Sequence, residues 1–263
     1  MNTSDFFISF WFVFAIAFLT IVWSFFFSPF FKIAEIKLSK NDIVTSDDIH
    51  KFIIDSAPLN LGENLLIVSK DQIKSHLAAA FPAITGINIK KELFHSLIVD
   101  FEKRIQVGIW CHSKQEPPAS PELQRGEQAD QCYYFDKEGI IFKEAPQTEG
   151  ALILKIKDFG KDEVFLGEQI LNNEQLVFII KFNNEIMKNN QFKIIEFEIK
   201  PSTNLDLGAK TDRGFSIYIN QDQDPVLEAN NLFTILNEVI KGNSSNLDYV
   251  DLRIPSRIFY KLK

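Results

Sequence analysis

YVDLRIPSRIFYKL, at residues 249–262, is the most informative segment of this 263-residue chain. Pro255 separates a first apolar-polar run, which begins at Tyr249, from a second run at Arg257–Leu262 that contains adjacent aromatic residues. These features predict a terminal β-strand over 257–262. Because this strand comes last in the chain order of its sheet, we expect it to lie at an edge, where backbone N–H and C=O groups are unpaired.

The predicted edge strand is a candidate surface for binding another protein, because an extended partner segment can add to an open sheet edge. Charged residues often block such edges, and Lys261 and Lys263 fit that alternative role. Three arginines near the strand, Arg253, Arg257 and Arg213, are suited to meet acidic partner side chains and to fix the register. Apolar or aromatic side chains on both faces of the strand favour binding: Ile258, Phe259, Tyr260 and Leu262.

The chain before this strand predicts a β-rich domain over 133–263, with a mixed or antiparallel sheet and two helices. Two hairpin turns are expected, at Asp136–Gly139 between aromatic-rich strands and at Thr211–Gly214. A helix capped by Asn172 carries an apolar stripe, and a second helix covers 225–240. Further strands are expected at 151–157, 164–166 and 192–200.

Two cysteines, Cys111 and Cys132, flank a polar segment that contains three prolines. Each adjoins an aromatic strand-like run, so a disulfide that joins two strand ends is expected across an insertion loop at 111–132. In the chain-entropy model such a bond stabilises the fold by roughly 3 kcal/mol. It indicates an oxidising compartment outside the cytoplasm. Two unrelated buried thiols are the alternative.

The first half of the chain predicts a smaller α+β unit over 32–110. An alternating strand follows Lys32, and two capping-box sequences then open helices at Thr45 and Ser69. Two more strands are expected, at 84–90 and 97–107. The predicted order is strand, helix, helix, strand, strand.

Several short sequences in this order resemble the FtsQ/DivIB family of bacterial cell-division proteins. The matching positions are Gly-x-Asn-Leu at 62–65, Phe-Pro at 81–82, Leu-x-Val-x-Phe-Glu-Lys-Arg at 97–104, Ile-Trp at 109–110, and Val-Asp-Leu-Arg at 250–253. The resemblance implies a POTRA domain (β-α-α-β-β) at 32–110, followed by the family's β domain at 133–263.

The resemblance also implies a function: a non-catalytic bitopic scaffold of the divisome, located at the division septum in the plasma (inner) membrane. Its implied partners are the bitopic coiled-coil division proteins of the FtsB/DivIC and FtsL type. They are expected to bind the extracytoplasmic domains, mainly by strand addition at the C-terminal edge strand. Arg213 and Arg253 are the arginines carried over from the family.

Residues 6–31 contain no ionisable side chain. As a helix this run would be about 39 Å long, against a hydrocarbon core of about 30 Å, which predicts a transmembrane helix. A cleaved signal peptide is disfavoured because residues 1–5 carry no Lys or Arg. We therefore expect residues 1–5 in the cytoplasm and the bulk of the chain outside it. Lys32, Lys37 and Lys40 favour the opposite orientation, although long domains translocate largely regardless of charge.

Composition and motifs predict no catalytic, cofactor, metal or small-molecule site. The net charge of −7 disfavours nucleic-acid binding. Four histidines, His50, His76, His95 and His112, show no metal-ligand spacing, and His50 and His76 are expected to be exposed. Paired carboxylates at Asp47-Asp48 and Glu196/Glu198 are expected to be solvated. Two alternatives remain open: a membrane-anchored cell-envelope hydrolase whose carboxylates converge in the fold, and a POTRA-type chaperone of exported proteins.

Overall fold

The computed structural model divides the chain into two compact units, unit 1 (Met1–Lys103) and unit 2 (Arg104–Lys263). It describes residues 3–27, 31–38, 43–55, 64–92, 95–113, 130–147, 152–161, 164–200, 206–241 and 244–263. Gly62 of the Gly-x-Asn-Leu match lies outside these residues, as does most of the predicted insertion loop. Both units combine helices with mixed sheets, so the fold class is α+β.

Unit 1 contains a three-stranded sheet with the order β1-β3-β2. The central strand β3 pairs in parallel with β1 and antiparallel with β2. The chain order after α1 is strand, helix, helix, strand, strand, as the sequence predicted. Its elements are α1 (Thr3–Phe27), β1 (Glu35–Leu38), α2 (Ser46–Asp55), α3 (Lys70–Ala80), β2 (Ile84–Glu92) and β3 (Ser96–Lys103).

The helices of unit 1 begin where their capping sequences predict. The Thr45 hydroxyl donates to Asp48 Oδ2 at 2.7 Å, and the Asp48 N–H donates back to Thr45 Oγ1. Ser69 accepts the N–H of Gln72 at the start of α3. These bonds satisfy N–H groups that have no partner inside the helix. The helices bury an apolar face with the sheet in one cluster, which includes Ile49, Ile53, Ile73, Leu77, Leu97 and Val99.

The prediction of a membrane-spanning helix over 6–31 is wrong. Among the described residues, no helix is both long enough and apolar enough to cross a membrane.

Unit 2 is built on one nine-stranded mixed sheet with the order β12-β11-β10-β9-β8-β7-β4-β5-β6. Parallel pairs join β4 to β7, β7 to β8 and β10 to β11, and the other neighbours are antiparallel. The strands are β4 (Gly108–His112), β5 (Gln131–Phe135), β6 (Ile141–Glu144), β7 (Leu154–Asp158), β8 (Ile194–Ile199), β9 (Asp206–Thr211), β10 (Ser216–Asn220), β11 (Leu247–Ile254) and β12 (Arg257–Leu262).

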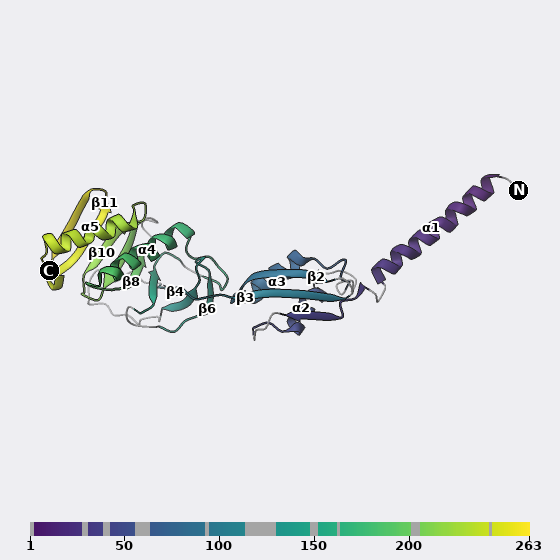
Figure 1. Cartoon of the computed structure of the whole chain (residues 1–263), viewed down its shortest axis with the longest axis horizontal. Helices are drawn as coiled ribbons and strands as arrows, with labels where there is room; N and C mark the ends of the chain where they lie inside the picture. The colour runs from purple at the N-terminus through teal and green to yellow at the C-terminus, as the bar shows by residue number, and fades with distance from the viewer. Residues whose placement is uncertain are drawn as a thin grey trace. The chain divides into compact units, whose positions relative to one another are not determined.

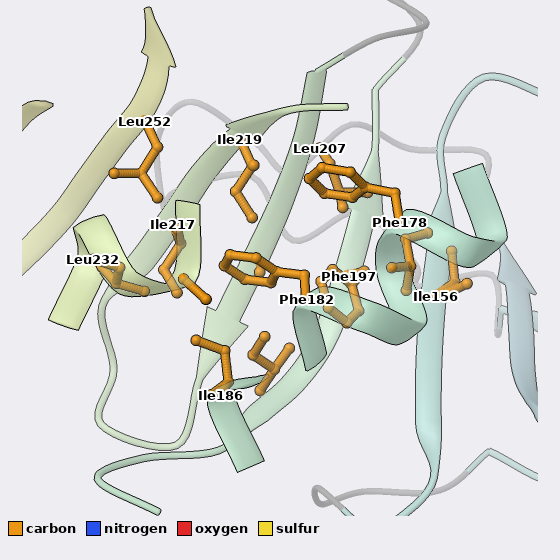
Figure 2. Packing of buried hydrophobic residues seen from close by; sticks show 14 of the residues in the cluster. Ile156, Phe178, Phe182, Ile186, Phe197, Leu207, Ile217, Ile219, Leu232 and Leu252 are labelled. Carbon is orange, nitrogen blue, oxygen red and sulfur yellow. The ribbon is translucent and has the colours of Figure 1, made fainter. Parts of the chain in front are cut away.

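Two helices of unit 2, α4 (Asn173–Asn189) and α5 (Pro225–Glu238), contact each other and lie over the sheet (Figure 1). Asn172 and Gln175 form the predicted capping box of α4, and Asp224 caps α5. Figure 2 shows the α4 side chains Phe178, Phe182 and Ile186 among residues from the sheet. This buried cluster fixes one face of the sheet, here called the helix face. It includes Ile156, Phe197, Leu207, Ile217, Ile219, Leu232, Val250 and Leu252.

The boundary between the units lies seven residues before the predicted domain end at 110, since 110 − 103 = 7. Ile109 and Trp110, expected to close the first domain, lie in β4 of unit 2. The reason is their pairing: β4 lies between β5 and β7, and both residues are fully buried. Val164–Leu166 is not a strand, although the sequence predicted one.

Arg104, the last residue of the match at 97–104, forms a buried ion pair with Asp136 of the predicted turn. The Arg104 guanidinium contacts Asp136 Oδ2, and both side chains are largely shielded from solvent. Asp136 Oδ1 also accepts the N–H groups of Glu138 and Ile140 in the predicted hairpin turn. Arg104 is therefore tied to the turn that leads from β5 to β6.

The two cysteines form a disulfide, with sulfur atoms 2.04 Å apart. Cys111 lies directly opposite Cys132 in the antiparallel pair β4–β5. The strands extend to His112 and back from Gln131, so they take up both ends of the predicted insertion loop at 111–132. Residues 114–129 of that loop lie outside the described residues.

Candidate interaction site at the edge of the nine-stranded sheet

The last strand, β12, lies at the edge of the nine-stranded sheet, as the sequence predicted. It pairs antiparallel with β11, its one neighbour among the described strands. A two-residue turn at Pro255 and Ser256 connects them, and Ser256 has φ of 63°. One side of β12 thus faces away from the sheet.

The two faces of β12 differ in chemistry. Tyr260 lies opposite Val250, and Leu262 opposite Leu247, so both side chains are on the helix face. Ile258, which packs against the core, shares this face. We call Ile258, Tyr260 and Leu262 the apolar stripe. The alternate residues lie on the other face, and we call Arg257, Phe259 and Lys261 the basic stripe.

Large apolar side chains on both faces of β12 are accessible. Phe259 is 49% exposed, Tyr260 42% and Leu262 50%. Solvent exposure of this kind, next to an unpaired backbone, leaves apolar surface that a partner strand would cover.

Free backbone groups on β12 follow from strand geometry. The Lys263 N–H donates to Asn246 O at 2.8 Å, so the backbone of residue 263 faces β11. Because successive residues in a strand direct their N–H and C=O to opposite sides, Phe259 and Lys261 also face β11. Ile258, Tyr260 and Leu262 then direct their N–H and C=O groups outward.

Arg253, predicted to meet a partner, is held by carboxylates of its own unit. Its Nη2 lies 2.7 Å from Asp251 Oδ2, and its Nη1 lies 3.2 Å from Asp206 Oδ2. The guanidinium also lies over the Tyr218 ring, 5.4 Å from the ring centre. The hydrogen bond from Arg253 lowers the pKa of Asp251. The charge of Arg253 is therefore largely neutralised within the fold.

Arg213 and Arg253 occupy opposite ends of the strands. Arg213 is in the turn between β9 and β10, and its Nη2 donates to Gln191 O at 3.4 Å. Gly214 of this turn lies close to Lys263, whereas Arg253 and Arg257 flank the turn between β11 and β12. The structure brings Arg253 and Arg257 to one end of the edge but does not bring Arg213 to them.

Lys261 has an intramolecular partner. Its Nζ donates to Asp248 Oδ2 at 2.9 Å, and this hydrogen bond raises the pKa of Lys261. Both side chains are exposed, so this pair contributes little stability. Within the described residues, no carboxylate lies within 4.0 Å of the Arg257 guanidinium. The sequence alternative of charged residues that guard the edge remains compatible with this arrangement.

The expectation of solvated charges at Glu196 and Glu198 is wrong. Both side chains are largely buried on the face opposite the helices and lie beside lysines: Lys210 Nζ is 2.9 Å from Glu196 and 2.5 Å from Glu198. Lys155 lies 3.3 Å from Glu196. Burial favours a higher pKa for Glu196, but the two lysines outweigh it and lower the pKa.

The sheet also places two residues that were not predicted from the sequence, Asp206 and Tyr218, beside Arg253. Asp206 and Tyr218 belong to β9 and β10, and strand pairing alone places them beside Arg253. With Lys200, they line a polar depression of about 350 Å³ on this face. No local motif marks Asp206 or Tyr218, because their proximity to Arg253 depends on the register of three strands.

Histidines and metal ligands give no alternative site in the part of the chain that the structure describes. His50 and His76 are exposed, as predicted. His112 is buried against Trp110, and neither of its ring nitrogens has a hydrogen-bond partner there. The described residues contain no group of three His, Cys, Asp or Glu side chains that could hold a metal ion.

Comparisons with known proteins do not identify the family. No protein-family model matches the chain. No curated protein sequence matches it either. The resemblance to FtsQ/DivIB therefore remains a prediction from short sequence matches.

Proposed function

We propose that this chain is a non-catalytic scaffold that binds another protein by adding the partner's strand to β12. The observation that carries the proposal is an edge strand with outward backbone groups and exposed apolar side chains on both of its faces. Backbone hydrogen bonds supply affinity in this mode, and alternate side chains supply specificity.

The proposed partners are division proteins of the FtsB/DivIC and FtsL type, and the proposed setting is the bacterial septum. Support comes from the FtsQ/DivIB-like sequence at Val250–Arg253, which directly precedes the edge strand. In the fold this sequence lies on β11, the strand that holds β12 in place. The disulfide between Cys111 and Cys132 supports a location outside the cytoplasm.

Loss of the edge should abolish capture of the partner. Tyr260→Pro removes one outward N–H, and Phe259→Glu replaces exposed apolar surface. The assay is co-purification of FtsB/DivIC-type and FtsL-type proteins with the tagged full chain, and both variants should lose capture. Capture by either variant at the level of the unsubstituted chain would contradict strand addition.

Phe165→Glu is the matched control for Phe259→Glu. Phe165 is a more exposed phenylalanine of the same unit, at 71%, and lies outside the sheet. It should retain full capture, because the substitution introduces the same charge without touching β12. Equal loss of capture in the two glutamate variants would show that charge, rather than the edge, controls binding.

A further inference from the structure

The apolar and basic stripes of β12 determine which residues a strand added to this edge would meet. Directly opposite residues of paired strands have Cβ atoms about 4.5–5.5 Å apart on the same face of the sheet. An added strand would therefore place alternate side chains beside the apolar stripe and beside the basic stripe. On the helix face the added side chains would extend the core surface around Ile258.

The charge of the basic stripe is only partly compensated. Among the described residues, Asp248 pairs with Lys261, and the guanidinium of Arg257 has no carboxylate within 4.0 Å. The nearest acidic residue across the ladder, Asp251, is engaged by Arg253. Positive charge therefore remains on this side of the edge, and it favours acidic residues in an added strand.

A second copy of the same chain would be a poor match for this edge. In an antiparallel pair, directly opposite residues lie on the same face of the sheet. Two β12 strands paired in this way would place the basic stripe of one copy opposite the basic stripe of the other. Like charges in that position are destabilising.

We propose that the two stripes make β12 selective: it accepts a strand that alternates apolar and acidic residues, and it disfavours pairing with a second copy of itself. This inference rests on the proposed strand addition and specifies its partner chemistry. Arg257 and Lys261 are then the residues that set specificity, while the outward backbone groups of the apolar stripe supply the hydrogen bonds.

Two fluorescent synthetic peptides of equal length test the partner chemistry, one alternating valine with glutamate and one alternating valine with lysine. Binding to the full chain is measured by fluorescence anisotropy. We expect the glutamate peptide to bind roughly tenfold more tightly, because its charges attract Arg257 and Lys261 across the strands, whereas the charges of the lysine peptide repel them. High salt should reduce the preference. In the double variant Arg257→Glu/Lys261→Glu the preference should reverse.

The outcomes separate this inference from the proposed function. Equal binding of the two peptides, lost in Tyr260→Pro, would overturn the charge selection and leave strand addition intact. No binding of either peptide to the unsubstituted chain would overturn both proposals. Binding that persists in Tyr260→Pro would show that the peptides bind elsewhere, which overturns both as well.

Pairing between copies gives an independent readout. Energy transfer between donor-labelled and acceptor-labelled chains should be low for the unsubstituted chain. It should rise when the unsubstituted chain is mixed with Arg257→Glu/Lys261→Glu, since opposite charges then face each other. Tyr260→Pro in one copy should remove that rise. Strong transfer between unsubstituted chains that Tyr260→Pro abolishes would overturn the self-exclusion.

Discussion

Replacing each of two neighbouring aromatic residues of β12, Phe259 and Tyr260, by proline tests which side of the strand carries the free backbone groups. Tyr260 and Phe259 are similarly exposed, at 42% and 49%, so the two substitutions remove comparable side-chain packing. The alternation along the strand directs the N–H of Tyr260 outward and the N–H of Phe259 toward β11. Tyr260→Pro therefore removes no hydrogen bond of the folded chain. Phe259→Pro removes a ladder hydrogen bond and places a ring inside the paired side.

The expected difference in stability follows from the lost ladder contact. A hydrogen bond contributes about 0.5–1.5 kcal/mol, and an unpaired acceptor adds a further cost. We expect Phe259→Pro to lower the free energy of unfolding of unit 2 by roughly 2 kcal/mol more than Tyr260→Pro. For a unit of this size, that difference corresponds to about 4–8 °C in the midpoint of thermal unfolding.

Differential scanning calorimetry of the full chain measures the two midpoints. The unsubstituted chain is the reference, and Tyr260→Pro should stay within about 2 °C of it. Equal shifts for the two variants, or a larger shift for Tyr260→Pro, would refute the assignment of outward backbone groups. The edge would then be paired differently from the arrangement described above.

Three further predictions concern the rest of unit 2. Arg253→Met should lower the free energy of unfolding by only about 1 kcal/mol at pH 7, because exposed ion pairs are weak. The pKa of Asp251 is lowered in the fold, so the contribution of this pair to stability is present above a pH of about 3.9 and is lost as the pH falls below that value. Urea unfolding at decreasing pH should therefore show the stabilities of the variant and the unsubstituted chain converging. Reduction of the disulfide, or Cys111→Ser with Cys132→Ser, should cost about 3 kcal/mol in urea unfolding, and an unchanged midpoint would show that the bond does not constrain the unfolded chain. Gly139→Ala should lower the free energy of unfolding by at least about 1 kcal/mol, because the φ of Gly139 is 73° and an added Cβ would clash with the carbonyl oxygen of Leu171. Circular dichroism during heating would measure the lower midpoint of unfolding, and an unchanged midpoint would contradict this prediction.

Short sequence patterns correctly predicted where helices begin and where the last strand lies, because these features depend on neighbouring residues. The capping residues Thr45, Ser69 and Asn172 each precede a helix, because a side-chain acceptor at that position satisfies N–H groups of the first turn. The strand at Arg257–Leu262 was predicted from its own residues and its place in the chain. Its expected position at the edge of the sheet agrees with the strand order, in which β12 comes first and pairs with β11.

Long-range pairing was not accessible to the same reasoning. The parallel pairing of β4 with β7 draws Trp110 into unit 2, and nothing near Trp110 in the sequence specifies that neighbour. The ion pairs of Arg253 with Asp206 likewise join residues far apart in the chain. The expectation of a membrane span over 6–31 rests on the length and the uninterrupted apolarity of that run, and the described residues contain no helix that meets both requirements.

The disulfide between Cys111 and Cys132 also has a consequence for the covalent continuity of the protein. Because it ties together two residues that face each other across neighbouring strands, it provides a second route along which the chain remains connected. A protease that cut the backbone once anywhere between these residues would produce two polypeptides on a reducing gel and one on a non-reducing gel. The backbone between the cysteines could therefore be opened, or a tag or small domain inserted there, while helices α1–α3 and strands β1–β4 stay covalently joined to the edge that we propose as the docking surface.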